Sequence, residues 1–256
     1  MTVHTQAQEY DAAHPTDSLY VENVWFEKSG VLVATVNLPG GSNNATDPWY
    51  GAPTMSPVQQ QEVADRTGAT LRWLDNAFAK ATANNDQAMV IMLQADMWDL
   101  DGLAMTNRHL TEYKQYIDKI AALTSAYGKP VLLINGDSHF YRSDNPLVKG
   151  AECKIEVPSA MGSKTIKTET CAQSMVDGAM KGISDVADPY GIVQVKDNPA
   201  YVPTYNVPNF HRLVMHGNAT ASGTDKEYLK LTVDASVNAP ASENAFGPFS
   251  WMRVQP

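Results

Sequence analysis

Two short apolar runs in the middle of the chain carry its clearest structural pattern. Residues 88–93 (AMVIML) and 131–134 (VLLI) hold no polar side chain, as is typical of strands buried on both faces of a parallel sheet. Between about 107 and 127, apolar side chains recur on one face of a helix, and Gly128 followed by Pro130 ends it. The strand–helix–strand order predicts a parallel pair with a right-handed crossover.

The rest of the pattern predicts an α/β domain over residues 19–256 that follows a flexible, polar arm over residues 1–18. A second helix is expected at 61–83, and further strands at 19–26, 31–36, 210–215, 228–233 and 249–254. Lys28-Ser29-Gly30 has the composition of a hairpin turn. The stretch 37–57 reads as a long loop, and its residues Trp49 and Tyr50 indicate that it packs against something. Residues of about 149–189 form a polar insertion, interpreted as a β-hairpin.

Length and charge exclude several classes of protein. A chain of 256 residues can bury the core of one large domain. The net charge of −9 and the lack of a basic run argue against a nucleic-acid partner. No stretch approaches the ~20 apolar residues that span a bilayer, and the first residues do not resemble a signal peptide.

The two cysteines, Cys153 and Cys171, both lie in the polar insertion. A disulfide between them would close a loop of roughly 18 residues and stabilise the fold by about 3 kcal/mol. The alternative is two free thiols in a cytoplasmic protein. Paired cysteines outside a core strand favour the disulfide, and with it a secreted or periplasmic location.

Polar side chains follow both apolar strands, where open α/β sheets bind ligands. Gln94 and Asp96 come after the first strand, and Asn135, Asp137 and His139 after the second. A carboxylate and an imidazole two residues apart can share a divalent metal or act as acid and base. The alternative is a structural turn in which the Asp137 carboxylate accepts hydrogen bonds from local amides. We expect Asp137 and His139 to face one crevice with Gln94 or Asp96 beside them.

Residues 130–141 (PVLLINGDSHFY) resemble the last motif of calcineurin-like metallophosphoesterases, in which Gly-His-x-His follows a strand. The order of elements over about 19–147 is also similar to that family. The resemblance implies a layered α/β/β/α sandwich and a metal-activated water that attacks a phosphoester. It also implies a divalent metal (Mn, Fe, Zn or Mg) on Asp137 and His139, with Asp96 and Gln94 as further ligands. Asn135, Tyr141 and Arg142 are the candidates for substrate binding.

The chain departs from the family pattern at several positions. Asp137 replaces the first histidine of the motif, and Gln94 occupies the place of another metal-binding histidine. The amino-terminal motifs Asp-x-His, Gly-Asp-x-x-Asp and Gly-Asn-His-Asp/Glu do not precede the motif here. The sequence therefore predicts a phosphoesterase-like domain that lacks part of the amino-terminal half and binds one metal weakly or none. Hydrolysis of phosphoesters is expected to be weak or absent.

Two other functions remain open. Gly136-Asp137-Ser138 resembles the nucleophile motif of Gly-Asp-Ser-Leu esterases, with Ser138 as nucleophile, but it lies mid-chain and no Asp-x-x-His follows. The other is a non-catalytic binding or assembly module, which the loss of ligands, the acidic charge and the long aromatic-bearing loop favour. The partners are accordingly a small phosphoester, another protein or a second copy of the chain.

Overall fold

The computed structural model describes residues 1–45, 48–98, 107–137, 141–148, 151–158, 164–170, 205–215 and 227–254. The helical elements are α1 (Gln6–Glu9), η1 (Pro15–Leu19), α2 (Gly40–Asn43), η2 (Trp49–Gly51), α3 (Pro57–Ala83) and α4 (Asn107–Tyr127). The strands are β1 (His4–Thr5), β2 (Val24–Lys28), β3 (Val31–Thr35), β4 (Ala88–Met92), β5 (Val131–Asn135), β6 (Arg142–Asp144), β7 (Glu152–Pro158), β8 (Lys164–Thr170), β9 (Phe210–Val214), β10 (Tyr228–Val233), β11 (Ala245–Phe246) and β12 (Phe249–Val254).

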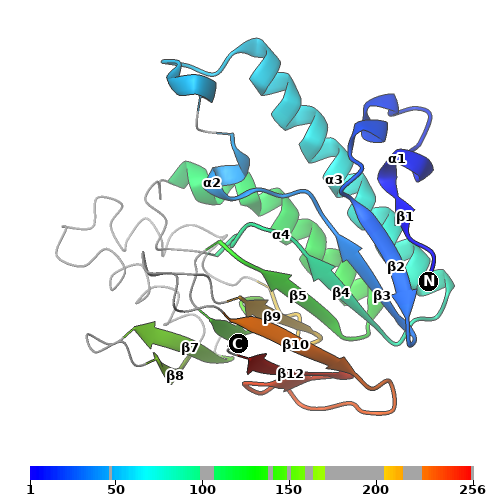
Figure 1. Ribbon diagram of the computed structural model, residues 1–256, viewed down its shortest axis with the longest axis vertical. Helices are drawn as coiled ribbons and strands as arrows, with labels where there is room; N and C mark the ends of the chain where they lie inside the picture. The colour runs from blue at the N-terminus through cyan, green and yellow to red at the C-terminus, as the bar shows by residue number, and fades with distance from the viewer. Residues whose placement is uncertain are drawn as a thin grey trace.

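Within the described residues, nine strands form one mixed sheet in the order β1-β2-β3-β4-β5-β9-β6-β7-β8 (Figure 1). The strands β3, β4, β5 and β9 are parallel to one another, and the strands on both sides of them are antiparallel. The predicted parallel pair is confirmed, since β4 and β5 are neighbours with Val90 opposite Leu132, and α4 lies between them in the chain. The α/β class predicted from the sequence is therefore confirmed.

The two faces of the large sheet are covered differently. Met89 and Ile91 of β4 pack in a core with side chains of α3 and α4, such as Trp73 and Ile117. Val90, between them in the strand, packs in a second core against the small sheet β10-β12-β11. Alternate residues of a strand point to opposite faces, so a strand covered on both faces must be apolar throughout. The described layers are thus helices, large sheet and small sheet (Figure 1).

The long helix α3 begins four residues before the predicted position of 61. Ser56 is its N-cap, and its hydroxyl accepts a hydrogen bond from the backbone N–H of Gln59 at 3.2 Å. Pro57 occupies the first turn, where a missing N–H has no cost. The Ser-Pro pair is thus the start signal, and the helix ends at Ala83 as predicted.

The first eighteen residues pack onto the edge of the large sheet, where the sequence predicted a loosely held arm. His4 and Thr5 pair with β2, and the Gln6 side chain is buried. Asp17 is 2% exposed, and both of its carboxylate oxygens accept hydrogen bonds from Arg72 of α3. A buried carboxylate requires such a partner, and no local pattern in residues 1–18 reveals one that lies 55 residues away.

The loop over residues 37–57 and the polar insertion are both predicted from the sequence. Trp49 is 40% exposed and Tyr50 is 102% exposed, so the Tyr50 ring packs against nothing in the described part of the chain. Tyr50 has a φ of 58°, and this turn directs its ring to solvent. The expected hairpin of the insertion is present as the antiparallel pair β7 and β8, while Cys171 lies outside the described residues. None of the helices in the described segments has the length and apolar character that crossing a bilayer requires.

Candidate functional site

The candidate site lies where the loops after β3, β4 and β5 leave the sheet. These loops stay paired beyond the strand ends: the Ala95 N–H donates to the Leu38 carbonyl at 3.1 Å, and the Gly136 N–H to the Gln94 carbonyl at 3.2 Å. Parallel strands place all three loops at one edge. The arrangement brings Gly40, Gln94 and Asp137 together although they are far apart in the chain.

The Asp137 carboxylate is the centre of this cluster. One oxygen accepts a hydrogen bond from Gln94 Nε2 at 3.1 Å, and the other from the Asp96 backbone N–H at 3.2 Å. Gln94 in turn accepts a hydrogen bond from the Gly40 N–H through its Oε1. A Cβ at Gly40 would lie 2.5 Å from the Asp137 carboxylate, so no larger residue fits there. Asp137 itself adopts a φ of 79°, a left-handed conformation that aspartate tolerates better than most residues.

The expected proximity of Asp137 to Gln94 and Asp96 is therefore confirmed, but Asp96 participates through its backbone. Its side chain is fully buried, and Oδ1 accepts hydrogen bonds from the Arg212 guanidinium at 2.6 Å and from the Trp98 N–H at 3.1 Å. Asp144 binds the same guanidinium through two hydrogen bonds of 2.8 and 2.6 Å. All three charged side chains are at most 1% exposed. The Asp96 carboxylate, which the sequence predicted to be a further metal ligand, is therefore bound to Arg212.

Arg212 and Asp144 are the residues that sequence reasoning missed. The signal was present, because Arg212 stands in the middle of the apolar strand FHRLV. A charged residue in such a strand indicates a buried ion pair. The carboxylates that pair with Arg212 belong to Asp144 and Asp96, which lie 68 and 116 residues away in the chain, and no sequence pattern identifies them.

The three candidates for substrate binding are all buried. Asn135 donates from Nδ2 to the Gly136 carbonyl at 3.0 Å, and its Oδ1 has no hydrogen-bond partner among the described residues. The Tyr141 hydroxyl donates to the Glu243 carbonyl at 2.7 Å and accepts from Trp251 Nε1, and burial raises its pKa to about 12. Arg142 is 3% exposed. Tyr141 therefore joins the large sheet to the small one.

A second polar pair, Ser143 and His211, lies in the sheet interface. His211 Nε2 lies 2.9 Å from Ser143 Oγ, and the ring packs between Phe246 and Trp251. Burial lowers its pKa to about 4, so the ring is neutral at physiological pH. His211 is thus a buried, hydrogen-bonded residue of the core.

Several site residues lie outside the part of the chain that the structure describes, namely Ser138, His139 and Cys171. Among the described residues, no group of three His, Cys, Asp or Glu side chains could hold a metal ion. In this part of the chain, Asp137 supplies the one side-chain carboxylate of the strand-end cluster, and both of its oxygens have protein partners. The metal, the role of His139 and the Cys153–Cys171 disulfide stay predictions.

No protein-family model, curated protein or solved structure matches this chain.

Proposed function

We propose that this chain is a metallophosphoesterase-like hydrolase domain with an incomplete metal centre and weak phosphoester hydrolysis. The main support for this proposal is that Asp137, Gln94 and the Asp96 amide meet at the carboxyl ends of parallel strands. Ligand sites of open α/β sheets lie at this edge. The described helices, large sheet and small sheet correspond to three of the four layers of an α/β/β/α sandwich.

In this proposal, Asp137 and His139 hold one divalent metal (Mn, Fe, Zn or Mg), which supplies an activated water when bound. Gln94 and the Asp96 amide fix the orientation of the Asp137 carboxylate. These same hydrogen bonds occupy both oxygens, so a metal must compete with them. One carboxylate and one imidazole make a weak site, and the hydrolysis of a small phosphoester is correspondingly slow.

A non-catalytic binding or assembly module is the second candidate. It is favoured by the closed hydrogen bonding of the cluster, in which Gln94 Oε1 and both Asp137 oxygens already have protein partners. Such a cluster is also what a structural turn requires. In that case the strand-end loops stabilise the fold, and the partner is a protein or a second copy of the chain.

The experiment that separates the two measures binding and turnover in the same protein. The purified chain is titrated with Mn²⁺ by calorimetry and assayed with p-nitrophenyl phosphate and bis-p-nitrophenyl phosphate. We expect weak binding and slow turnover that Asp137→Asn and His139→Ala both abolish. Asp234→Asn, an exposed carboxylate in the turn after β10, is the matched control and should change neither.

Two results would count against the proposal. A chain that neither binds Mn²⁺ nor turns over either ester supports the binding module. Fast turnover that survives both substitutions would place the active site elsewhere. The proposed Cys153–Cys171 disulfide and a secreted or periplasmic location are compatible with either function.

A further inference from the structure

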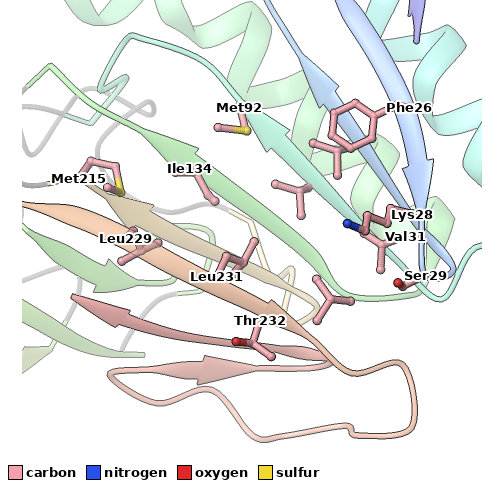
Figure 2. Close-up of a pocket in the computed structure, with 13 residues that line it drawn as sticks. Phe26, Lys28, Ser29, Val31, Met92, Ile134, Met215, Leu229, Leu231 and Thr232 are labelled. Carbon is pink, nitrogen blue, oxygen red and sulfur yellow. The ribbon is translucent and has the colours of Figure 1, made fainter. Parts of the chain in front are cut away.

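An apolar groove of about 630 Å³ opens between the large sheet and the strand β10 (Figure 2). Thirteen residues line it, and ten of them carry apolar side chains. They come from β2, β3, β4 and β5 on the face opposite the helices, from β10, and from Met215 directly after β9. A volume of this size falls in the range of pockets for small organic ligands, roughly 300–1,000 Å³.

The groove exists because the small sheet covers only part of the large one. The order β10-β12-β11 makes β10 an edge strand, so nothing in the described small sheet continues beyond it toward β2. Met92 at the end of β4 is 41% exposed, and Phe26 and Val33 are only half-buried. Exposed apolar surface that is concave, and rimmed by polar residues, marks a binding site more often than a scattered apolar residue does.

The two ends of the groove differ in chemistry. Lys28, the last residue of β2, and Ser29, in the turn that follows, lie at one end, and Figure 2 shows the Lys28 side chain turned toward the other lining residues. Within the described part of the chain, Lys28 makes no ion pair. Met92 and Met215 lie toward the other end in Figure 2. Methionine side chains are flexible and adapt to ligands of variable shape.

We propose that this groove binds a single-chain fatty acid, with its carboxylate on Lys28 and its alkyl chain along the apolar strands toward Met92 and Met215. The argument for this occupant is charge complementarity, since a single cation at one end of an apolar groove matches one anionic head on one apolar tail. Lys28 is the one cation among the residues that line the groove, in a chain whose net charge is −9. Lys28 precedes the start of β3 and Asp137 follows the end of β5, so the carboxylate end of the groove lies far from the proposed hydrolase centre. The Met92 and Met215 end lies at the same edge of the sheet as that centre, since the Met215 N–H donates to the Asn135 carbonyl.

The test uses the full chain and dodecanoate, with displacement of bound cis-parinaric acid as the readout. Dodecanol serves as a neutral ligand of equal length. We expect Lys28→Met to weaken dodecanoate binding by roughly two- to fivefold, as for an exposed ion pair, and to leave dodecanol binding unchanged. Met92→Glu should weaken both ligands. Lys230→Met is the matched control, because Lys230 is an exposed cation of β10 that does not line the groove.

A second measurement needs no substitution. In methyl NMR spectra of methionine-labelled protein, the Met92 and Met215 signals should shift as dodecanoate is added. The signal of Met252, which is exposed on β12 and lies outside the groove, should keep its chemical shift. Failure of the wild-type chain to bind dodecanoate would overturn the proposal. Dodecanoate binding that neither Lys28→Met nor Met92→Glu affects would also overturn it. So would a dimer, detected by analytical ultracentrifugation, that Met92→Glu dissociates, because the groove would then be occupied by a second copy of the chain.

Discussion

Replacing Arg212 by methionine should be among the most damaging single substitutions outside the apolar core. The Arg212 guanidinium is fully buried and holds two carboxylates, Asp96 at 2.6 Å and Asp144 at 2.8 and 2.6 Å. It also lies 5.2 Å from the centre of the Trp98 ring. Methionine fills much of the same volume but leaves both carboxylates buried without the cation.

The expected loss follows from that geometry. Removing one partner of a buried ion pair costs about 3–5 kcal/mol, because the remaining charge has neither water nor a partner. The free energy of unfolding of such a domain is only about 5–15 kcal/mol, so the variant should be barely stable. The free energy of unfolding is measured by urea titration, followed by circular dichroism and tryptophan fluorescence.

Two further variants identify the cause of the loss. Adding Asp144→Asn to Arg212→Met removes one of the stranded charges and should recover about 1–2 kcal/mol. Lys119→Met breaks the ion pair with Asp75, whose side chain is 49% exposed, and should cost less than about 1 kcal/mol. The reasoning would be refuted by an Arg212→Met protein as stable as Lys119→Met, or by a double variant that is less stable than the single one.

Three other predictions concern pH and the cysteines. Burial lowers the pKa of His211 from 6.5 to about 4, so this histidine takes up a proton in the unfolded chain at a higher pH than in the folded one. About 3 kcal/mol of stability should therefore be lost as the pH falls from about 6.5 to 4. His211→Phe should flatten that part of the curve of unfolding free energy against pH. Burial, together with the neighbouring Glu27, raises the pKa of Asp86 to about 6 from 3.8, so stability should fall as the pH rises through that range. Asp86→Asn should therefore add about 1–2 kcal/mol at pH 7 and nothing at pH 3.5, and an equal gain at both values would exclude this cause. Mass spectrometry without reductant should find Cys153 joined to Cys171, and two free thiols there would exclude the disulfide and the argument for export.

The central elements of this protein could be predicted from local patterns in its sequence. The runs 88–93 and 131–134 have the pattern of strands covered on both faces, and the helical periodicity between them indicates a crossover. The structure shows these elements as β4, α4 and β5. The strand ends then identified where Asp137, Gln94 and Asp96 would meet, because parallel strands present their carboxyl ends at one edge. Local periodicity determines these features, and local periodicity is visible in a single chain.

Which side chains meet depends on contacts between segments that lie far apart in the chain. Asp96 reaches Asp137 through its backbone N–H because its carboxylate is bound to Arg212, which is 116 residues away. Asp17 fixes the first residues of the chain by binding Arg72, which no pattern in a polar segment reveals. The groove beside β10 likewise depends on how far a small sheet extends over a larger one. Pairing over long separations is decided by burial and by the requirement that each buried charge has a partner, and a linear pattern contains neither.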